Sequence, residues 1–427
     1  MLYQLWRQTL ITHRDYLAVH DVVAGLRHRF SDLQKALDQL PTLKSRSLHE
    51  ASIQQGAWHF ILQTLRAWRD DAVLCPVDHA SPGIVDAGIL PAQVCHLKLT
   101  SGSTGEPRCI MFEAAQLRAD VENIRASMQL DAAIPNLAVI SLAHSYGFSN
   151  LVLPLLLQGQ PLVLVPDALP GSLRLAFGHH DHLILPAVPA MWRAWYRSEL
   201  LHASPISLAI SAGAPLPLEL EQTVYDECGL KIHNFYGSSE CGGIAYDNTN
   251  TPRTDAAFAG RTMQGVSLSC TEAGNLQVQS DAVGLGYLSP DQTGVDTLSK
   301  GRFIASDLAE ISDGRVFLRG RISDAINVAG KKLNPSDVEA AVLTFPEVKH
   351  CIVFGVPSAD PTRCEETIAC VHVADGITED HLATWLCDRL ALWQMPRRYW
   401  LCQDLLPDVR GKISRREWKE KWLKVQD

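Results

Sequence analysis

Short apolar runs alternate with longer helical stretches from residue 95 to about residue 245, and this alternation constrains the fold more than any other feature. The runs are LAVISL (137–142), PLVLVP (161–166), HLILPA (182–187) and SLAIS (207–211). Strands separated by helices of this length favour a parallel sheet covered by helices. We therefore predict an α/β fold whose large N-terminal domain holds parallel sheets.

The pattern changes towards the C-terminus. Between residues 260 and 320, SLSC, NLQVQ and RVFLRG are short strand-like runs separated by glycine-containing turns, which predicts a small antiparallel β module. In the last hundred residues, VEAAVLTF and EDHLATWLCDRLAL are helical in character, and HCIVFGVP and TIACVHVA are strand-like. We predict a small α+β C-terminal domain. The motifs below divide the chain into domains 1–322 and 323–427.

Composition excludes several classes of protein. Of the 427 residues, 46% are hydrophobic and 20% are charged, as in soluble enzymes, and the net charge of −9 argues against a nucleic-acid partner. The eleven cysteines include no C-x-x-C pair, so we expect reduced thiols and a cytoplasmic protein. The start of the chain lacks an apolar signal segment, and Pro154 and a Gln-Gly-Gln-Pro turn interrupt the most apolar region, 151–165. We predict no membrane span there, but a buried helix, a turn and a buried strand.

The segment LTSGSTGEPR, residues 99–108, combines two glycines with four hydroxyl side chains directly after the strand-like run VCHLKL. Glycines let backbone N–H groups approach an anion, and the hydroxyls add donors, which is typical of a phosphate-binding loop. The G-x-x-x-x-G-K-[ST] pattern of a P-loop is absent. Taken alone, a Ser/Gly-rich segment of this kind is more often an ordinary loop.

Four further segments give this loop a context. They are SAGAPLP (211–217), NFYGSSECGG (234–243), FIASDLAEISDGRVFLRGRISDAINVAGKKLNPSDVEAAV (303–342) and LPDVRGKISRREW (406–418). In this order and at these separations, the five segments resemble the adenylate-forming superfamily, which includes acyl-CoA and aryl-CoA synthetases, peptide-synthetase adenylation domains and firefly luciferase. The resemblance runs from about residue 15 to residue 420. It includes DYLAVHDVVAGLRHRFSDLQKAL and GAWHFILQTLRAWRDDAVLCPVD as a shortened version of the family's N-terminal strands and helices.

The resemblance implies a two-step reaction. A carboxylate and ATP give an acyl-adenylate and pyrophosphate, and the acyl group then passes to a thiol. The first step brings two anions together, so it needs positive charge, N–H donors and a metal ion on the phosphates. The implied cofactors are ATP and Mg²⁺. The implied partners are a small carboxylic acid and either CoA or the phosphopantetheine of an acyl carrier protein, for a protein that is a monomer or a homodimer.

The resemblance also implies a role for each matching position. The residues implied to bind phosphate are Thr100, Ser101, Gly102, Ser103, Thr104, Gly105 and Arg108. Those implied to surround the adenine are Gly213, Ala214, Pro215, Asn234, Tyr236, Gly237, Ser238 and Ser239. Glu240 would bind Mg²⁺, Asp307 the ribose with Arg321 beside it, and Lys412 would bridge the substrate carboxylate and the α-phosphate. A lysine suits that position because it is a compact charge on a flexible stem.

His144, in LAHSYGF, either lines the acyl pocket, gates the lysine or is a buried structural histidine. The chain departs from the family pattern at Arg108, where lysine is usual, at Ser306, where glycine is usual, and at the hinge position, Ser323. Two alternatives stay open: an enzyme that makes an amide or another product from the same adenylate, and a non-catalytic nucleotide-binding relative.

Overall fold

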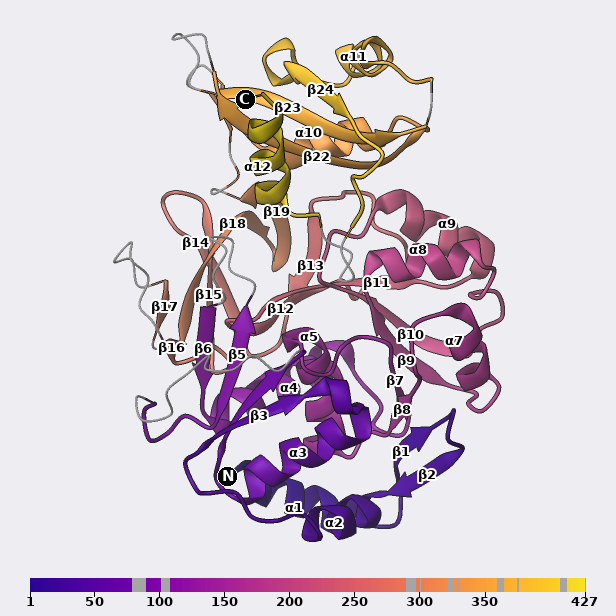
Figure 1. Ribbon diagram of the computed structural model, residues 1–427, viewed down its shortest axis with the longest axis vertical. Helices are drawn as coiled ribbons and strands as arrows, with labels where there is room; N and C mark the ends of the chain where they lie inside the picture. The colour runs from indigo at the N-terminus through magenta and orange to yellow at the C-terminus, as the bar shows by residue number, and fades with distance from the viewer. Residues whose placement is uncertain are drawn as a thin grey trace. The chain divides into compact units, whose positions relative to one another are not determined.

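The computed structural model describes residues 1–78, 90–100, 108–288, 297–299, 301–321, 324, 326–328, 331–358, 365–374, 376–407 and 413–426 (Figure 1). The chain divides into two compact units. The first comprises Met1–Ser269, Gln277–Ala305 and Ile311–Phe317, and the second comprises Cys270–Leu276, Ser306–Glu310 and Leu318–Asp427. Among the described residues, no helix is long and apolar enough to cross a membrane.

A parallel sheet forms the centre of the first unit. Its strands, in spatial order, are β11 (Ile232–Ser238), β10 (Ile206–Ser211), β9 (Leu183–Ala187), β7 (Asn136–Ala138), β8 (Leu162–Leu164) and β1 (Leu17–Asp21). All the neighbours in this row pair in parallel. Helices α7 (Pro170–Phe177), α8 (Pro189–Arg197) and α9 (Leu218–Cys228) lie together on one flank of it (Figure 1). This confirms the predicted parallel sheet with helical cover.

The helices of this layer begin and end where the sequence directs. A proline in the first turn of α7 and of α8 presets the backbone for a helix, and Gly229 ends α9 in the left-handed conformation at φ = 65°. Trp192 and Trp195 of α8 are fully buried against the sheet, with their rings edge to face at 5.1 Å. These large side chains supply much of the apolar area that fixes the helix on the sheet.

The strand predictions are confirmed at different lengths. HLILPA and SLAIS correspond to β9 and β10, and residues 151–165 form α6 (Leu153–Gln158), a turn at Gly159 and β8, as predicted. LAVISL was predicted as a strand over 137–142, but β7 ends at Ala138. Beyond it the backbone at Gly147 packs closely on that at Ser141: a Cβ at Gly147 would lie 2.0 Å from the carbonyl oxygen of Ser141.

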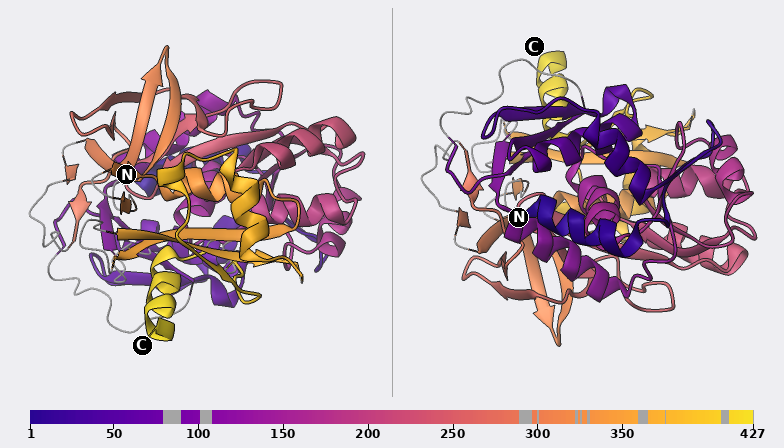
Figure 2. Two further views of the ribbon diagram at one scale, coloured as in Figure 1. Left: turned by 90° about the horizontal axis from the view of Figure 1, so that it is seen from above. Right: turned by 90° about the horizontal axis from the view of Figure 1, so that it is seen from below.

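A second sheet holds the strands that precede and follow the Ser/Thr/Gly loop. Its order is β16 (Gly286–Tyr287), β6 (Arg108–Phe112), β5 (His96–Thr100), β4 (Val73–Val77) and β3 (Leu48–Ser52). Seen from below, α1 (Leu2–His13), α2 (Phe30–Asp38) and α3 (Ala57–Arg69) gather on one side of the unit (Figure 2). The N-terminal strand, helix and helix–strand pattern is confirmed by β1, β2 (Leu26–Arg29), α2, α3 and β4. The sequence analysis did not predict α1.

The predicted antiparallel module is confirmed. β12 (Gly242–Tyr246) pairs antiparallel with β11 and with β13 (Phe258–Thr262), and β13 pairs antiparallel with β19 (Arg315–Arg321). The runs SLSC, NLQVQ and RVFLRG correspond to β14 (Val266–Cys270), β15 (Asn275–Ser280) and β19. The long strand β18 (Arg302–Ser312) carries residues of both units.

The second unit contains a three-stranded sheet with a core on each face. The strands β22 (Val348–Pro357) and β23 (Glu365–Val373) pair antiparallel, and β24 (Arg398–Leu401) adds in parallel. One core includes residues of α10 (Pro335–Leu343) and α11 (Glu379–Cys387), and the other includes Trp418 and Trp422 of α12 (Arg415–Gln426). These elements confirm the predicted α+β composition. The helix predicted over 379–392 ends at Cys387, and a short 3₁₀ turn at Leu392–Gln394 follows.

A cluster of histidines joins β1 to the segment after α7. His20, which is buried, lies with its Nδ1 2.8 Å from Nε2 of His180, and its ring centroid lies 5.4 Å from that of His179. Burial, then Arg27 on the paired strand β2, then His180 and His179 lower the pKa of His20 to about 4, against a smaller opposite effect of Asp21. Burial, Arg27 and His179 also lower the pKa of His180. The His20 ring is therefore neutral in the folded protein near pH 6.

We expect this cluster to make stability fall with acidity. A histidine that stays neutral when folded but takes up a proton near pH 6.5 when unfolded stabilises the fold above that pH and loses its contribution as the pH falls towards 4. When the pH falls from 7.5 to 5, the parental protein should lose about 2 kcal/mol more unfolding free energy than His20→Gln does. Urea denaturation at both pH values measures this difference. The exposed His202→Gln is the matched control. An unchanged pH dependence in His20→Gln would contradict this assignment.

Candidate active site

The Ser/Thr/Gly loop connects two paired antiparallel strands. Thr100 ends β5 and Arg108 begins β6, and the two residues are partners in the strand register. The hydroxyl of Thr100 donates a hydrogen bond to the carbonyl oxygen of Arg108 at 3.5 Å. The strand predicted before the loop is therefore present. The other predicted phosphate-binding residues, Ser101, Gly102, Ser103, Thr104 and Gly105, lie outside the described residues.

The carboxylate of Glu240 is held by two hydroxyl donors. Glu240 lies in the turn between β11 and β12, where the hydroxyl of Ser238 donates to its Oε2. The phenol of Tyr287, which comes from β16 in the other sheet, donates to its Oε1 at 3.0 Å. The backbone N–H of Gly284 also donates to the Glu240 carbonyl oxygen at 2.8 Å. These hydrogen bonds to both oxygens fix the orientation of the Glu240 carboxylate.

Tyr287 brings two predicted site residues to one ring. The guanidinium of Arg108 lies 5.2 Å from the ring centroid, while the phenol of the same ring bonds Glu240. Burial and the neighbouring Glu240 carboxylate raise the pKa of Tyr287 well above its ordinary value, so the phenol remains a hydrogen-bond donor. A planar guanidinium stacks on an aromatic face better than an ammonium does, which gives a physical reason for arginine at position 108.

Sequence reasoning missed Tyr287. It lies in the segment VGLGYLSP, whose residues carry no recognisable catalytic pattern, and it is 47 positions from Glu240 along the chain. The pairing of β16 with β6, in which Tyr287 is the partner of Ile110, brings it to the site.

A buried ion pair, Asp120 with Lys98, holds the turn that carries Glu240. Asp120 of α4 (Ala114–Met128) accepts hydrogen bonds from the N–H of Gly243 at 3.3 Å and from the hydroxyl of Ser149 at 2.6 Å. Its Oδ2 lies 3.7 Å from Nζ of Lys98, and the two side chains are only 2% and 3% exposed, respectively. Lys98 is two residues before Thr100 on β5. One ion pair thus joins the strand before the phosphate loop to the turn of Glu240.

Gly242 and Gly243 serve close packing here. Gly242 has φ = 71°, and a Cβ on it would lie 2.0 Å from Oδ1 of Asp120, while a Cβ on Gly243 would lie 2.6 Å from Sδ of Met263. The sequence analysis did not predict the contacts of these two glycines with Asp120 and Met263. These glycines let Asp120 and Met263 reach the turn.

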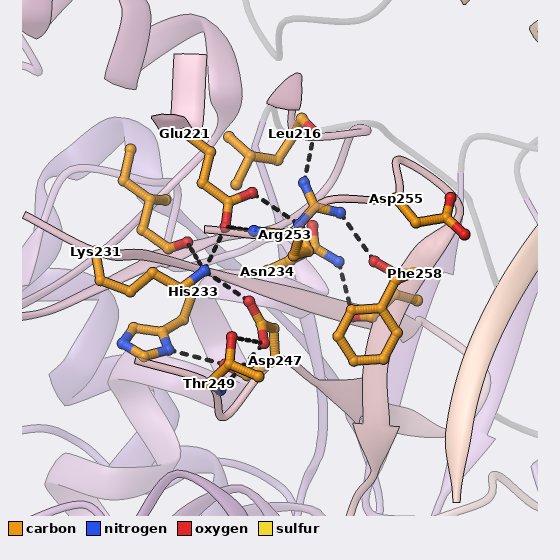
Figure 3. Close-up of polar contacts among 12 residues, drawn as sticks. Leu216, Glu221, Lys231, His233, Asn234, Asp247, Thr249, Arg253, Asp255 and Phe258 are labelled. Atoms are coloured by element: carbon orange, nitrogen blue, oxygen red, sulfur yellow. Dashed lines mark hydrogen bonds and ion pairs between the residues drawn. The ribbon is translucent and has the colours of Figure 1, made fainter. Parts of the chain in front are cut away.

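The residues expected around the adenine lie at the ends of β10 and β11. Gly213 has φ = 83°, which favours glycine, and Gly213 and Pro215 are exposed while Ala214 is half-buried. On β11, Tyr236 and Ser238 are half-buried and Gly237 is exposed, and Ser239, directly after the strand, is half-buried. Asn234 is buried, and its amide donates to the carbonyl oxygen of Ala259 at 2.8 Å (Figure 3). That donor is therefore used within the fold.

The remaining predicted residues belong to other parts of the chain. Asp307 is half-buried on β18 and belongs to the second unit, whereas Glu240 belongs to the first. Arg321 ends β19, and Lys412 and Ser323 lie outside the described residues. His144 is half-buried and directly precedes the short helix α5 (Ser145–Gly147). The structure therefore brings together Arg108 and Glu240, with Thr100 beside Arg108 in the register.

Comparison with known proteins places this arrangement in a family. The model of the AMP-binding enzyme family matches residues 10–289, and that of the AMP-binding enzyme C-terminal domain matches residues 337–412. The chain is 29% identical over 346 residues to a feruloyl-CoA synthase of Amycolatopsis sp., which covers 76% of this chain and 69% of the relative. It is 26% identical over 340 residues to a long-chain-fatty-acid–CoA ligase of Bacillus subtilis, covering 75% of this chain and 60% of that one.

Solved structures share the fold. ATP-bound MatB from Rhodopseudomonas palustris superposes with a TM-score of 0.84 at 18% identity, covering 100% of both chains. The o-succinylbenzoate CoA synthetase MenE from Bacillus subtilis, in complex with its acyl-adenylate intermediate, superposes with a TM-score of 0.81 at 16% identity and covers 97% of both chains. Because the two family models together match residues 10–289 and 337–412, this chain belongs to the AMP-binding enzyme family, the adenylate-forming enzymes.

Proposed function

We propose that this chain is an AMP-forming acid–thiol ligase. It joins a carboxylic acid to ATP, releases pyrophosphate and passes the acyl group from the adenylate to the thiol of CoA. The observation that carries the proposal is the meeting of Glu240 and Arg108 at Tyr287, because a fixed carboxylate beside a cation is what a metal–phosphate site needs. The membership of the family and the CoA ligases among the relatives support the same reaction.

The residues present fit a magnesium ion. Mg²⁺ takes oxygen ligands and is usually bound by one or two carboxylates together with substrate phosphates. The Glu240 carboxylate supplies such oxygens, and the hydroxyls of Ser238 and Tyr287 fix its orientation. When bound, the ion would neutralise charge on the phosphates during attack by the carboxylate. Arg108 would add a second positive charge, and the Thr100–Gly105 loop would supply N–H and hydroxyl donors.

We propose the remaining roles from the sequence motifs. Asp307 and Arg321 would hold the ribose, and Lys412 would bridge the substrate carboxylate and the α-phosphate. The segment after residue 322 would then act as a mobile domain that hinges at Ser323 and withdraws Lys412 before the thiol reacts. Within the second unit, the Arg415 guanidinium bonds Asp324, one residue beyond Ser323, and also Glu339 at 2.6 Å. Arg415 thereby links the start of that domain to the segment that follows Lys412.

For the acid, we propose an aromatic or medium-chain acyl group, with the region of His144 forming one wall of its pocket. The similarity to feruloyl-CoA synthase supports an aromatic acid. For the acceptor, we propose CoA, with a carrier-protein phosphopantetheine as the second thiol to test. Lys331 is exposed, and its Nζ lies 5.1 Å from the centroid of the Trp393 ring. We propose that its positive charge meets an acidic acceptor. We also propose a cytoplasmic location, because the ten described cysteines are all free thiols.

The proposed metal site predicts a graded loss of adenylation. Glu240→Gln keeps the shape but loses the charge, so Mg²⁺-dependent ATP–pyrophosphate exchange with aryl and fatty acids should fall by about 100-fold. Tyr287→Phe removes one orienting donor and should cost about tenfold. The matched control is another tyrosine–glutamate pair, Tyr196 and Glu227, whose hydrogen bond is 2.7 Å long on the surface. Parental exchange rates in both Glu240→Gln and Tyr287→Phe would reject the site.

The proposed role of Lys412 predicts that the two half-reactions separate. Lys412→Ala should lower adenylate formation by on the order of 100-fold, because it removes charge stabilisation from the transition state. Supplied with chemically synthesised acyl-adenylate, the same variant should still form the thioester with CoA. Lys424→Ala, an exposed lysine of α12, is the control. Equal losses in both half-reactions would show that Lys412 supports the fold instead.

A further inference from the structure

Four charged side chains form a buried cluster beside the residues expected to surround the adenine (Figure 3). Glu221 comes from α9, Lys231 directly precedes β11, Asp247 follows β12 and Arg253 precedes β13. Their side chains are 0% exposed for Glu221 and Asp247, 8% for Lys231 and 2% for Arg253. Two cations face two carboxylates, so the formal charges of the cluster balance.

Every carboxylate oxygen of the cluster has a partner. Lys231 bonds Glu221 and donates to Oδ2 of Asp247 at 2.7 Å. Thr249 donates to Oδ1 of Asp247 from its hydroxyl at 2.7 Å and from its N–H at 3.1 Å. Arg253 donates to Glu221 from Nε at 2.8 Å and from its backbone N–H at 3.0 Å. A buried network of this kind is costly unless it is fully satisfied, and this one is.

The guanidinium of Arg253 also bonds two backbone carbonyl groups. Nη2 donates to Leu216 at 2.7 Å and Nη1 donates to Phe258 at 2.9 Å. Leu216 directly follows the exposed turn Gly213–Pro215. Phe258 begins β13, and the next residue, Ala259, accepts the amide hydrogen bond of Asn234. Arg253 thus connects the end of the turn to the strand that holds Asn234.

Asp247 fixes the same region from the other side. Its N–H donates to the carbonyl oxygen of Asn234 at 2.8 Å, and its carbonyl oxygen lies 2.8 Å from Nδ1 of His233. The cluster is therefore bonded to both chain segments that the proposed function puts against the adenine. Replacing buried ion pairs with apolar side chains is often neutral or stabilising, so net stability alone does not account for four charges here.

Resting on the proposed function, we propose that Arg253 is a positioning residue for the nucleotide. Together with Glu221, Lys231 and Asp247, it presets the Gly213–Pro215 turn and the start of β11 for the adenine side of ATP. Arg253 acts through the backbone of Leu216 and Phe258, without touching the nucleotide. The Arg253 guanidinium bonds a carboxylate and two carbonyl groups in different directions. A lysine ammonium cannot reproduce this forked arrangement.

The test compares two arginines with the same kind of environment. Arg253→Lys keeps the charge but loses the fork, and we expect the dissociation constant of AMP, measured by isothermal titration calorimetry, to rise on the order of tenfold. Arg69→Lys is the matched control. Arg69 also bonds a carboxylate, that of Asp70 at 2.7 Å, and backbone carbonyl groups, those of Leu37 at 2.7 Å, Leu40 at 3.2 Å and Pro41 at 3.3 Å, but it lies on α3. Urea unfolding of both variants measures how much stability each one loses.

The outcomes separate the two claims. Weaker AMP binding in Arg253→Lys but not in Arg69→Lys, at similar losses of stability, supports the proposal. Unchanged binding in Arg253→Lys, or equal weakening in both variants, overturns it. If Arg253→Lys does not fold, Glu221→Gln is measured in the same way, and failure of both to fold would assign the cluster to folding alone. A parental protein that does not bind AMP would reject the proposed function, and this inference with it.

Discussion

The contact between Asp120 and Gly242 is the constraint on which the geometry around Glu240 depends. The carboxylate occupies the space that a side chain at position 242 would need, and it accepts the N–H of Gly243. Because Asp120 also faces Lys98, the turn of Glu240 and the strand that enters the phosphate loop share one buried ion pair. Removing one partner of such a pair costs about 3–5 kcal/mol, so neither element can shift independently without a large penalty.

The same arrangement recurs on the adenine side of the proposed site. There, Arg253 and Glu221 bind the end of an exposed turn to buried strands. In both places, turns with positive-φ glycines carry the residues expected to meet ligand, and buried charges in full hydrogen-bond contact hold those turns. Directional bonds restrict a turn more narrowly than apolar packing does, which suits a site that must meet phosphates and a base in defined orientations.

The sequence predicted the parts of this protein that depend on local pattern. The strands β9 and β10 follow from uninterrupted apolar runs, and the C-terminal elements follow from alternation and helical periodicity. The family resemblance proposed roles for Glu240 and Arg108, because each lies in a compact motif. The end of β7 at Ala138 was not predicted, because the apolar run continues to Leu142 and carries no local signal for the end of a strand. Tyr287, Asp120 and Arg253 were missed for a related reason: their partners lie far away in the sequence, so no local spacing reveals them.

The central claim, that an acid is activated as its adenylate, is tested most directly by following oxygen. The protein is incubated with ATP, Mg²⁺, CoA and an aromatic acid whose carboxylate carries ¹⁸O, and the nucleotide product is analysed by mass spectrometry. If the carboxylate attacks the α-phosphorus and the thiol then displaces AMP, one ¹⁸O atom must leave with the AMP. The account predicts singly labelled AMP together with the CoA thioester. Thioester formation with unlabelled AMP, or with ADP as the nucleotide product, would contradict it.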